Sequence, residues 1–313
     1  MVAAGGGCVV LSRAVRMREM QRRDGLRPDS AAMRVALGAA LGLLGFTAAA
    51  ADGQMQVAID ATTHATASLV GARLHVVLSP GGSEQWLDAN VDDGEGGGSV
   101  RSDDYNFDGH RDLAVTAMLG QVNEATLVFL FDPVQRRFQP LAAPRRPAVQ
   151  CDGLWNLTPD AKDRSLTSAC RSGPMWYSDQ YRYASDGRLY VYRSQQPIES
   201  PDIQSLLGRD GDDAYPLSVW STFDARGGVV ATAIGETLES PMPVQLRVQV
   251  ARLPLYATPT AASTRRYLVQ GDRADALDVS TDGMRIKLRY RSATAGEVVG
   301  WVAVDAASAG SGQ

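Results

Sequence analysis

The stretch 103–113 holds five candidate metal ligands at a suitable spacing, and these are Asp104, Asn106, Asp108, His110 and Asp112. The order follows D-x-[DN]-x-[DN]-G-x-x-acid, the first nine positions of an EF-hand-type calcium loop. Ca²⁺ prefers six to eight oxygen ligands, which alternate residues of a curled loop can aim at one centre. Gly109 allows the sharp turn because glycine accepts positive φ. His110 would offer its backbone carbonyl, and Asp112 would bind directly or through a water. We expect a structural Ca²⁺ here.

The residues after this loop do not continue as an EF-hand does. The twelfth position is Val115, where an EF-hand has a bidentate Glu on its exiting helix. Val115 lies in the short apolar run 113–118, which predicts a buried strand rather than an amphipathic helix. The pattern therefore favours a calcium loop between β elements, and the alternative is a solvated acidic hairpin.

The charge distribution argues against nucleic acid as a partner. Of the 31 basic and 35 acidic residues, seven arginines and three acids lie in residues 1–34. The remainder has 24 basic and 32 acidic residues, a net charge of −8. Nucleic-acid-binding proteins are instead recognised by basic patches.

Residues 1–51 are expected to be a leader, with a secretory signal at about 33–51. An arginine precedes an apolar stretch of about 15 residues, and small residues before Asp52 offer a cleavage site. A membrane span needs about 20 apolar residues, so we expect no permanent membrane anchor. The expected location is the periplasm.

Export would place the cysteines in an oxidising compartment. Cys8 belongs to the leader, which leaves Cys151 and Cys170 as a pair that predicts a disulfide. The alternative is a zinc site, but no histidine stands at metal-ligand spacing from either cysteine.

A loop rich in aromatic residues follows Cys170. Ser172-Gly173-Pro174 predicts an exposed turn, and Trp176 and Tyr177 come directly after it. Aromatic residues on a loop held by a disulfide form a rigid contact surface suited to a protein partner. The alternative is that Trp176 and Tyr177 begin the next strand and pack inward.

The C-terminal part, 243–307, resembles a bacterial SH3-type module. Leu255-Tyr256-Ala257-Thr258-Pro259, Tyr267-Leu268-Val269-Gln270-Gly271-Asp272 and Gly300-Trp301-Val302 match the family's order of motifs. The resemblance implies a small SH3-like barrel and possible contact with peptidoglycan. Met284 stands where such modules often have an aromatic residue. Residues 206–242 between the two regions are expected to be a linker with a hairpin.

Residues 52–205 resemble the FG-GAP-like, calcium-binding periplasmic immunity proteins that protect bacteria from lysozyme-like effectors. The resemblance rests on Asn106-Phe107-Asp108-Gly109-His110-Arg111-Asp112-Leu113, on the Ser172-Gly173 to Tyr177 loop, and on the hairpin signal Asp186-Gly187. It implies an all-β fold. This fold would be an incomplete, propeller-like β domain that is similar to periplasmic lysozyme inhibitors. It also implies that Ser172, Gly173 and Tyr177 enter a hydrolase cleft. Pro174-Met175-Trp176 departs from the family's pattern.

We therefore expect a non-enzymatic, calcium-stabilised protein that inhibits a peptidoglycan hydrolase. The first alternative is a cell-envelope adaptor that binds peptidoglycan or a protein through the SH3-like module. A glycosidase with paired carboxylates is the second alternative, but the sequence lacks a G-x-S-x-G nucleophile motif and its histidines have no evident partner.

Overall fold

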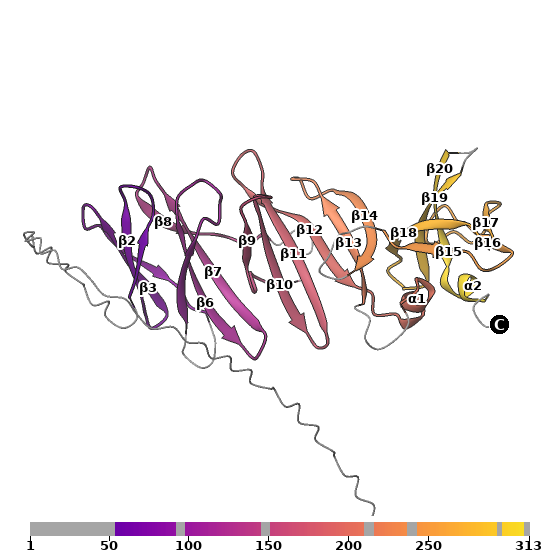
Figure 1. Ribbon diagram of the computed structural model, residues 1–313, viewed down its shortest axis with the longest axis horizontal. Helices are drawn as coiled ribbons and strands as arrows, with labels where there is room; N and C mark the ends of the chain where they lie inside the picture. Colours follow the sequence, from indigo (N-terminus) through magenta and orange to yellow (C-terminus); the bar gives the residue numbers. More distant parts are fainter. Residues whose placement is uncertain are drawn as a thin grey trace, which may run out of the picture. The chain divides into compact units, whose positions relative to one another are not determined.

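The computed structural model describes residues 54–91, 98–144, 151–209, 216–236, 243–292 and 296–309. These residues form antiparallel sheets with two short helices, so the all-β prediction is confirmed (Figure 1). The predicted leader and its signal segment lie outside the described residues, as does most of the glycine-rich stretch 92–98.

The first sheet is a four-stranded antiparallel meander. Its strands are β1 (Gln54–Ala58), β2 (His64–Val70), β3 (Arg73–Ser79) and β4 (Glu84–Asp88). The apolar run 69–78 is divided between two strands, because Gly71 takes a φ of 57° and turns the chain between them. His75 lies on the outer face of this sheet, opposite the buried Leu74 and Val76. There it stacks on Trp86 with ring centroids 4.2 Å apart and hydrogen-bonds Glu84.

The second sheet is another four-stranded meander, and it is buried on both faces at its centre. Its strands are β5 (Ser99–Asp103), β6 (Asp112–Leu119), β7 (Asn123–Asp132) and β8 (Arg137–Pro140). Alternate residues of a strand point to opposite faces. Leu113 and Val115 accordingly pack into a core with the first sheet, and Ala114 packs into a core with the third. Burial on both faces explains why the run 113–118 is apolar without alternation.

The third sheet has six strands in an unbroken meander. They are β9 (Thr158–Asp160), β10 (Ser165–Ser172), β11 (Met175–Tyr183), β12 (Leu189–Pro197), β13 (Leu217–Phe223) and β14 (Val229–Glu236). The hairpin expected within 206–242 exists as β13–β14, but it continues this sheet through the pairing of β12 with β13 rather than standing apart as a linker. A short helix, α1 (Pro201–Leu206), follows Ser200, whose hydroxyl accepts the Ile203 N–H.

The C-terminal module, residues 243–309, consists of two small sheets and a helix. Its elements are β15 (Gln245–Arg247), β16 (Arg252–Pro254), β17 (Tyr267–Val269), β18 (Arg273–Val279), β19 (Arg285–Ser292), β20 (Gly296–Ala303) and α2 (Val304–Ser308). A backbone bridge between Tyr256 and Trp301 joins the segment after β16 to β20. A Cβ at Gly300 would lie 2.6 Å from Leu255 and 2.8 Å from the Tyr256 carbonyl oxygen. This close approach explains why glycine precedes the tryptophan.

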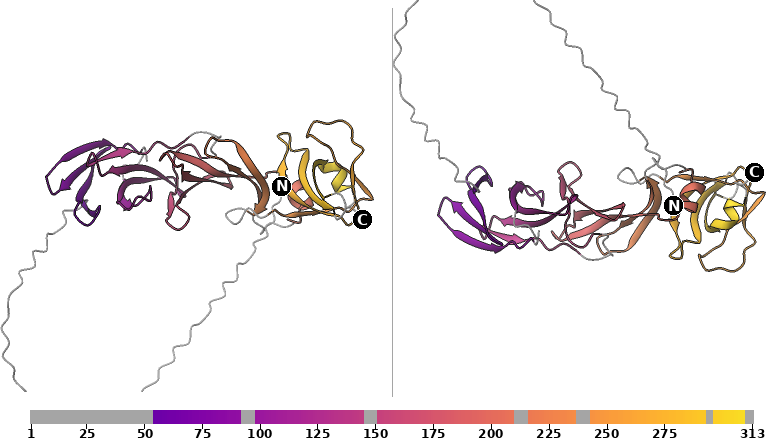
Figure 2. Two further views of the ribbon diagram at one scale, coloured as in Figure 1. Left: turned by 90° about the horizontal axis from the view of Figure 1, so that it is seen from above. Right: turned by 90° about the horizontal axis from the view of Figure 1, so that it is seen from below.

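Neighbouring parts of the chain share three buried clusters. The first and second sheets share one, the second and third share another, and the end of the third sheet shares the last with the C-terminal module. Sheets consecutive in sequence are therefore neighbours in space, as the two further views show (Figure 2). The turns at the ends of these sheets are partly anchored in the shared cores, since Ile59 of the β1–β2 turn and Tyr105 and Phe107 of the β5–β6 turn belong to them.

Candidate functional site

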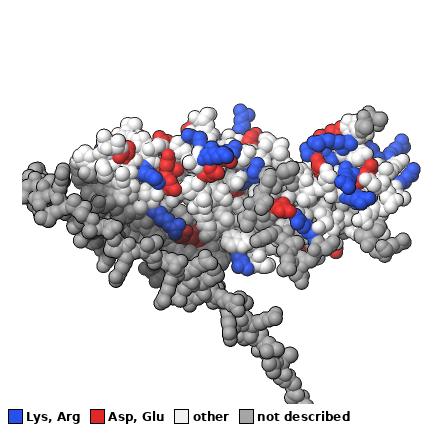
Figure 3. Space-filling model, in the orientation of Figure 1, with Lys and Arg blue, Asp and Glu red and all other residues white. Residues whose placement is uncertain are grey.

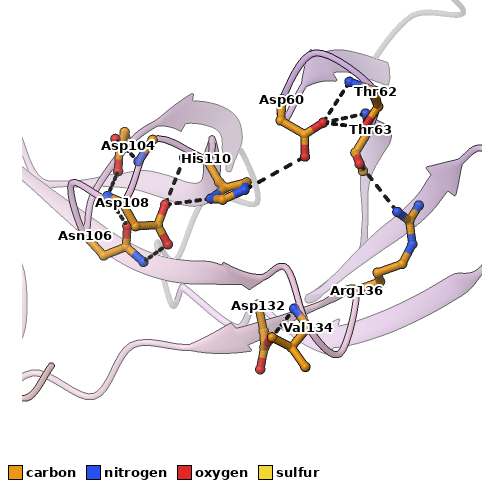
Figure 4. A network of polar contacts seen from close by, with 11 residues as sticks. Asp60, Thr62, Thr63, Asp104, Asn106, Asp108, His110, Asp132, Val134 and Arg136 are labelled. Atoms are coloured by element: carbon orange, nitrogen blue, oxygen red, sulfur yellow. Dashed lines mark hydrogen bonds and ion pairs between the residues drawn. The ribbon is translucent and has the colours of Figure 1, made fainter. Parts of the chain in front are cut away.

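The acidic loop, residues 104–111, connects β5 to β6 and is curled by its own side chains (Figure 4). The two carboxylate oxygens of Asp104 accept the backbone N–H groups of Asp108 at 3.1 Å and Gly109 at 2.9 Å. The Asn106 side chain accepts the Asp108 N–H through Oδ1 and donates to Asp108 Oδ2 at 2.8 Å. Phe107 and Gly109 have φ values of 60° and 92°, which the tight curl requires. The predicted turn at Gly109 is thus present.

His110 connects the acidic loop to the turn between β1 and β2. Asp108 Oδ1 accepts the His110 backbone N–H at 2.8 Å and lies 3.1 Å from the ring Nδ1. On the other side of the ring, Nε2 is 4.0 Å from Asp60 Oδ2. Asp60 also caps its own turn by accepting the backbone N–H groups of Thr62 and Thr63. The Thr62 N–H is the main cause that lowers the Asp60 pKa to about 2, so this carboxylate stays ionised.

Asp60 was not among the residues predicted from the sequence. The only local signal is the Asp-Ala-Thr-Thr order at 60–63, which is typical of an Asx-turn rather than of a binding site. Its proximity to His110 depends on the packing of the first sheet on the second, which no short motif encodes.

Asp112 is fully buried and fastens the end of the loop to the second sheet. Its Oδ2 accepts the Tyr105 N–H and its Oδ1 accepts the Phe131 N–H, both at 2.8 Å. The Asp112 pKa is raised to about 7, mainly by burial and to a lesser degree by the nearby carboxylates of Asp108 and Asp104, while the two hydrogen bonds act in the opposite direction. The carboxylate therefore has a structural task of its own, which the sequence pattern did not show.

The acidic loop offers the oxygen ligands that Ca²⁺ prefers. In this structure, however, the side chains of Asp104, Asn106 and Asp108 form hydrogen bonds within the loop itself. No group of three or more His, Cys, Asp or Glu side chains is gathered to hold a metal ion within the part of the chain that the structure describes. The donors nevertheless include an Asn side chain and a backbone carbonyl, and all of them are oxygens. Each Asp112 oxygen accepts one described hydrogen bond and keeps a second lone pair. This oxygen-only set fits a hard cation.

The predicted contact loop is the tip of the β10–β11 hairpin. Ser172 pairs with Met175, so Gly173 and Pro174 form a two-residue turn, and Gly173 has the positive φ of 59° that such turns need. Ser172, Gly173 and Pro174 are exposed. The predicted disulfide between Cys151 and Cys170 is confirmed, two residues before Ser172, with Cα atoms 5.8 Å apart.

A pair of hydrogen bonds also holds this hairpin tip in place. Asn123, the first residue of β7, donates from Nδ2 to the Arg171 carbonyl at 3.0 Å and accepts the Arg171 N–H through Oδ1 at 2.8 Å. Arg171 in turn donates from Nε to the Gly173 carbonyl at 3.1 Å. Neither residue was predicted, because an Asn at the start of a strand gives no sign that it will bond a residue 48 positions away.

Trp176 and Tyr177 are both half-buried strand residues rather than free loop residues. They pair across the hairpin with Arg171 and Cys170 respectively, and as consecutive strand residues they point to opposite faces. Both side chains are partly exposed, and neither belongs to a buried cluster of the described residues. Trp176 and Tyr177 thus lie within the strand, and their role as a contact surface stays a prediction.

The structure does not bring the acidic loop and the hairpin tip together. Burial, followed by the carboxylates of Asp112, Asp104 and Asp108, raises the pKa of Tyr183 at the far end of β11. The Tyr183 ring lies 6.4 Å from the ring of Phe107, centroid to centroid, so that end of the strand is next to the loop. At roughly 3.3 Å per residue, the tip lies about 25 Å away along β11. A metal in the loop would act on the tip only through the sheets between them.

No family model, curated protein or solved structure matches this chain. Among the described residues, no helix is both long and apolar enough to cross a membrane.

Proposed function

We propose that this protein is exported to the periplasm and inhibits a lysozyme-like peptidoglycan hydrolase by inserting the β10–β11 hairpin tip into its active-site cleft. Such a tip occupies a sugar subsite and so keeps the substrate away from the catalytic carboxylates. In this proposal the protein has no catalytic task of its own. Its biological role is that of an immunity protein against a secreted effector.

The observation that supports this proposal best is the bracing of an exposed tip from two sides. The disulfide at Cys170 and the paired hydrogen bonds of Asn123 hold the strand that leads into Ser172 and Gly173. A tip that is fixed before binding loses little conformational entropy when it enters a cleft. Trp176 and Tyr177, which are both partly exposed, provide contact area next to the tip.

Calcium would stabilise the opposite end of the same sheets. Asp104, Asn106, Asp108, Asp112 and the His110 carbonyl would hold the ion. The bound ion would neutralise the closely spaced carboxylates and fix the loop between the first and second sheets. We propose a structural role for it, because the loop is far from the hairpin tip.

We further propose that the three meander sheets are the blades of an incomplete propeller-like domain, and that residues 243–307 form an SH3-like module. Two observations favour this assignment. The acidic loop joins the first two strands of a four-stranded sheet, and the bridge between Tyr256 and Trp301 unites the segments that carry the SH3-type motifs.

The proposal is tested by a charge placed on the tip. We compare Ser172→Arg with Ser185→Arg, which alters an exposed serine at the far end of the same hairpin, in the turn between β11 and β12. The assay follows loss of turbidity of purified peptidoglycan with a panel of lysozyme-like muramidases, including any captured from envelope extract by the full chain. The unmodified chain and Ser185→Arg should inhibit at least one enzyme, and Ser172→Arg should not.

Equal inhibition by both variants would remove the tip from the mechanism. If the unmodified chain inhibits no muramidase but is retained on peptidoglycan, the adaptor function replaces the inhibitor function.

A further inference from the structure

The C-terminal module contains a pocket of about 600 Å³ that the proposed inhibitor function does not use. It lies between the chain leading into β17 and the β19–β20 hairpin. A volume of this order is within the range of pockets that hold small ligands or short peptide segments. The lining residues used in the argument below are Leu255, Arg265, Arg266, Tyr267, Tyr290 and Val298.

The floor of this pocket is apolar and firmly held. Leu255 is buried in the core of the module, and Val298 packs partly against that core. The Tyr290 hydroxyl donates to Asp272 Oδ1 at 3.0 Å, which fixes its ring at the side of the pocket. At the rim, Tyr267 is 47% exposed, a large fraction for an aromatic side chain. An apolar floor of this kind binds ligand side chains rather than water.

The rim carries positive charge that the module itself does not neutralise. Arg265 and Arg266 are exposed, and neither forms an ion pair with a carboxylate of the described residues. The one acid that lines the pocket, Glu297, lies 3.8 Å from the guanidinium of Arg291. The guanidinium of Arg252 lies over the Tyr267 ring at 4.4 Å and adds further positive charge. Basic side chains gather over this module in Figure 3, although the whole chain has a net charge of −4.

We infer that this pocket binds a short acidic peptide segment. A carboxylate of the peptide pairs with the guanidinium groups of Arg265 and Arg266, which can donate two parallel hydrogen bonds to it. A neighbouring apolar side chain of the peptide lies between Tyr267 and Tyr290 on the floor formed by Leu255 and Val298. A bare phosphate or other small anion would leave this apolar floor unused, so the combination favours a peptide.

Binding to the full chain is measured by isothermal titration calorimetry with two capped peptides, Ala-Glu-Leu-Glu-Ala and its uncharged analogue Ala-Gln-Leu-Gln-Ala. We expect the Glu peptide to bind and the Gln peptide to bind at least about tenfold more weakly, because hydrogen bonds between charged groups are stronger than those between neutral groups. Arg265→Gln/Arg266→Gln should weaken binding of the Glu peptide by about tenfold or more.

The matched control is Arg247→Gln/Arg273→Gln. These exposed arginines face each other across β15 and β18 and lie outside the pocket. Their substitution removes the same amount of positive charge as the pocket variant. The control should retain the affinity of the unmodified chain within about twofold, since charges at a distance are screened by salt. Unfolding midpoints of both variants confirm that the module stays folded.

Three results would overturn the inference. They are no binding of the Glu peptide, equal binding of the Glu and Gln peptides, and an equal loss of affinity in the two double variants. The last result would mean that general electrostatic attraction, rather than this pocket, holds the peptide. None of these measurements involves a hydrolase, so the inference stands or falls separately from the inhibitor function.

Discussion

At the scale of single residues, Asp112 is a predicted metal ligand for which the structure shows a separate structural role. Its spacing within the acidic loop predicts a metal ligand, and the structure shows a buried carboxylate that joins Tyr105 to Phe131 through their backbone N–H groups. The loop pattern could be predicted because metal ligands are spaced by local geometry. The second role could not, because Phe131 is brought to Asp112 only by the pairing of β6 with β7.

We expect Asp112→Asn to destabilise the chain by about 1–3 kcal/mol in the presence of a chelator. An amide has a single acceptor oxygen, so one of the two buried N–H groups loses its partner. Urea unfolding measures the change. Asp163→Asn, at an exposed turn between β9 and β10, should alter stability by less than about 0.5 kcal/mol. Equal effects of the two substitutions would contradict the assigned role.

The raised pKa of Asp112 predicts a specific dependence of stability on pH. Burial raises the Asp112 pKa from 3.8 to about 7, so the folded state keeps a proton that the unfolded state releases. The stability from this proton is complete below the unfolded pKa and is lost as the pH rises toward 7. With chelator present, the free energy of unfolding should fall more steeply between pH 4 and pH 7 in the unmodified chain than in Asp112→Asn. Parallel pH profiles would rule the effect out.

At the scale of elements, the hairpin β10–β11 was the most predictable part of the site. Ser172-Gly173-Pro174 predicts a turn, and the export expected from residues 33–51 predicts that Cys151 and Cys170 form a disulfide. The run 69–78 was less predictable, because apolar residues on both sides of Gly71 hide the turn between β2 and β3. The extension of the third sheet by β13 and β14 was also missed, because sheet membership depends on contacts distant in sequence.

We expect Cys151→Ser/Cys170→Ser to lower the free energy of unfolding by about 3 kcal/mol, because the disulfide closes a loop of roughly 20 residues in the unfolded chain. Urea unfolding of the variant and of the oxidised unmodified chain gives the difference. A reductant should destabilise the unmodified chain by a similar amount and leave the variant unaffected. If removal of both cysteines left stability unchanged, the disulfide would not constrain the hairpin as described.

At the scale of the whole molecule, shared cores connect the acidic loop to the hairpin tip. The second sheet contributes residues to the buried clusters on both of its faces. It therefore packs against the first sheet on one side and the third sheet on the other. The sequence predicts many of the strands through their apolar patterns. It does not predict which sheets share a core, because alternate residues of β6 serve different neighbours.

Calcium should stabilise this assembly. We expect the melting temperature to rise on going from chelator to millimolar Ca²⁺, since a ligand at 100 times its Kd adds about 2.7 kcal/mol. Asp104→Asn/Asp108→Asn should abolish the rise. Thermal unfolding followed by circular dichroism measures both. A melting temperature that does not respond to Ca²⁺ in the unmodified chain would exclude a structural calcium site.

The most direct test of the inhibitor function is a photo-crosslinking residue placed at position 172 of the full chain in its own envelope, with position 185 as the matched control. The account predicts that position 172 crosslinks to a peptidoglycan hydrolase, at residues lining its substrate cleft, and that position 185 does not. Crosslinks from position 172 to proteins without hydrolase activity, or the same crosslinks from both positions, would contradict it.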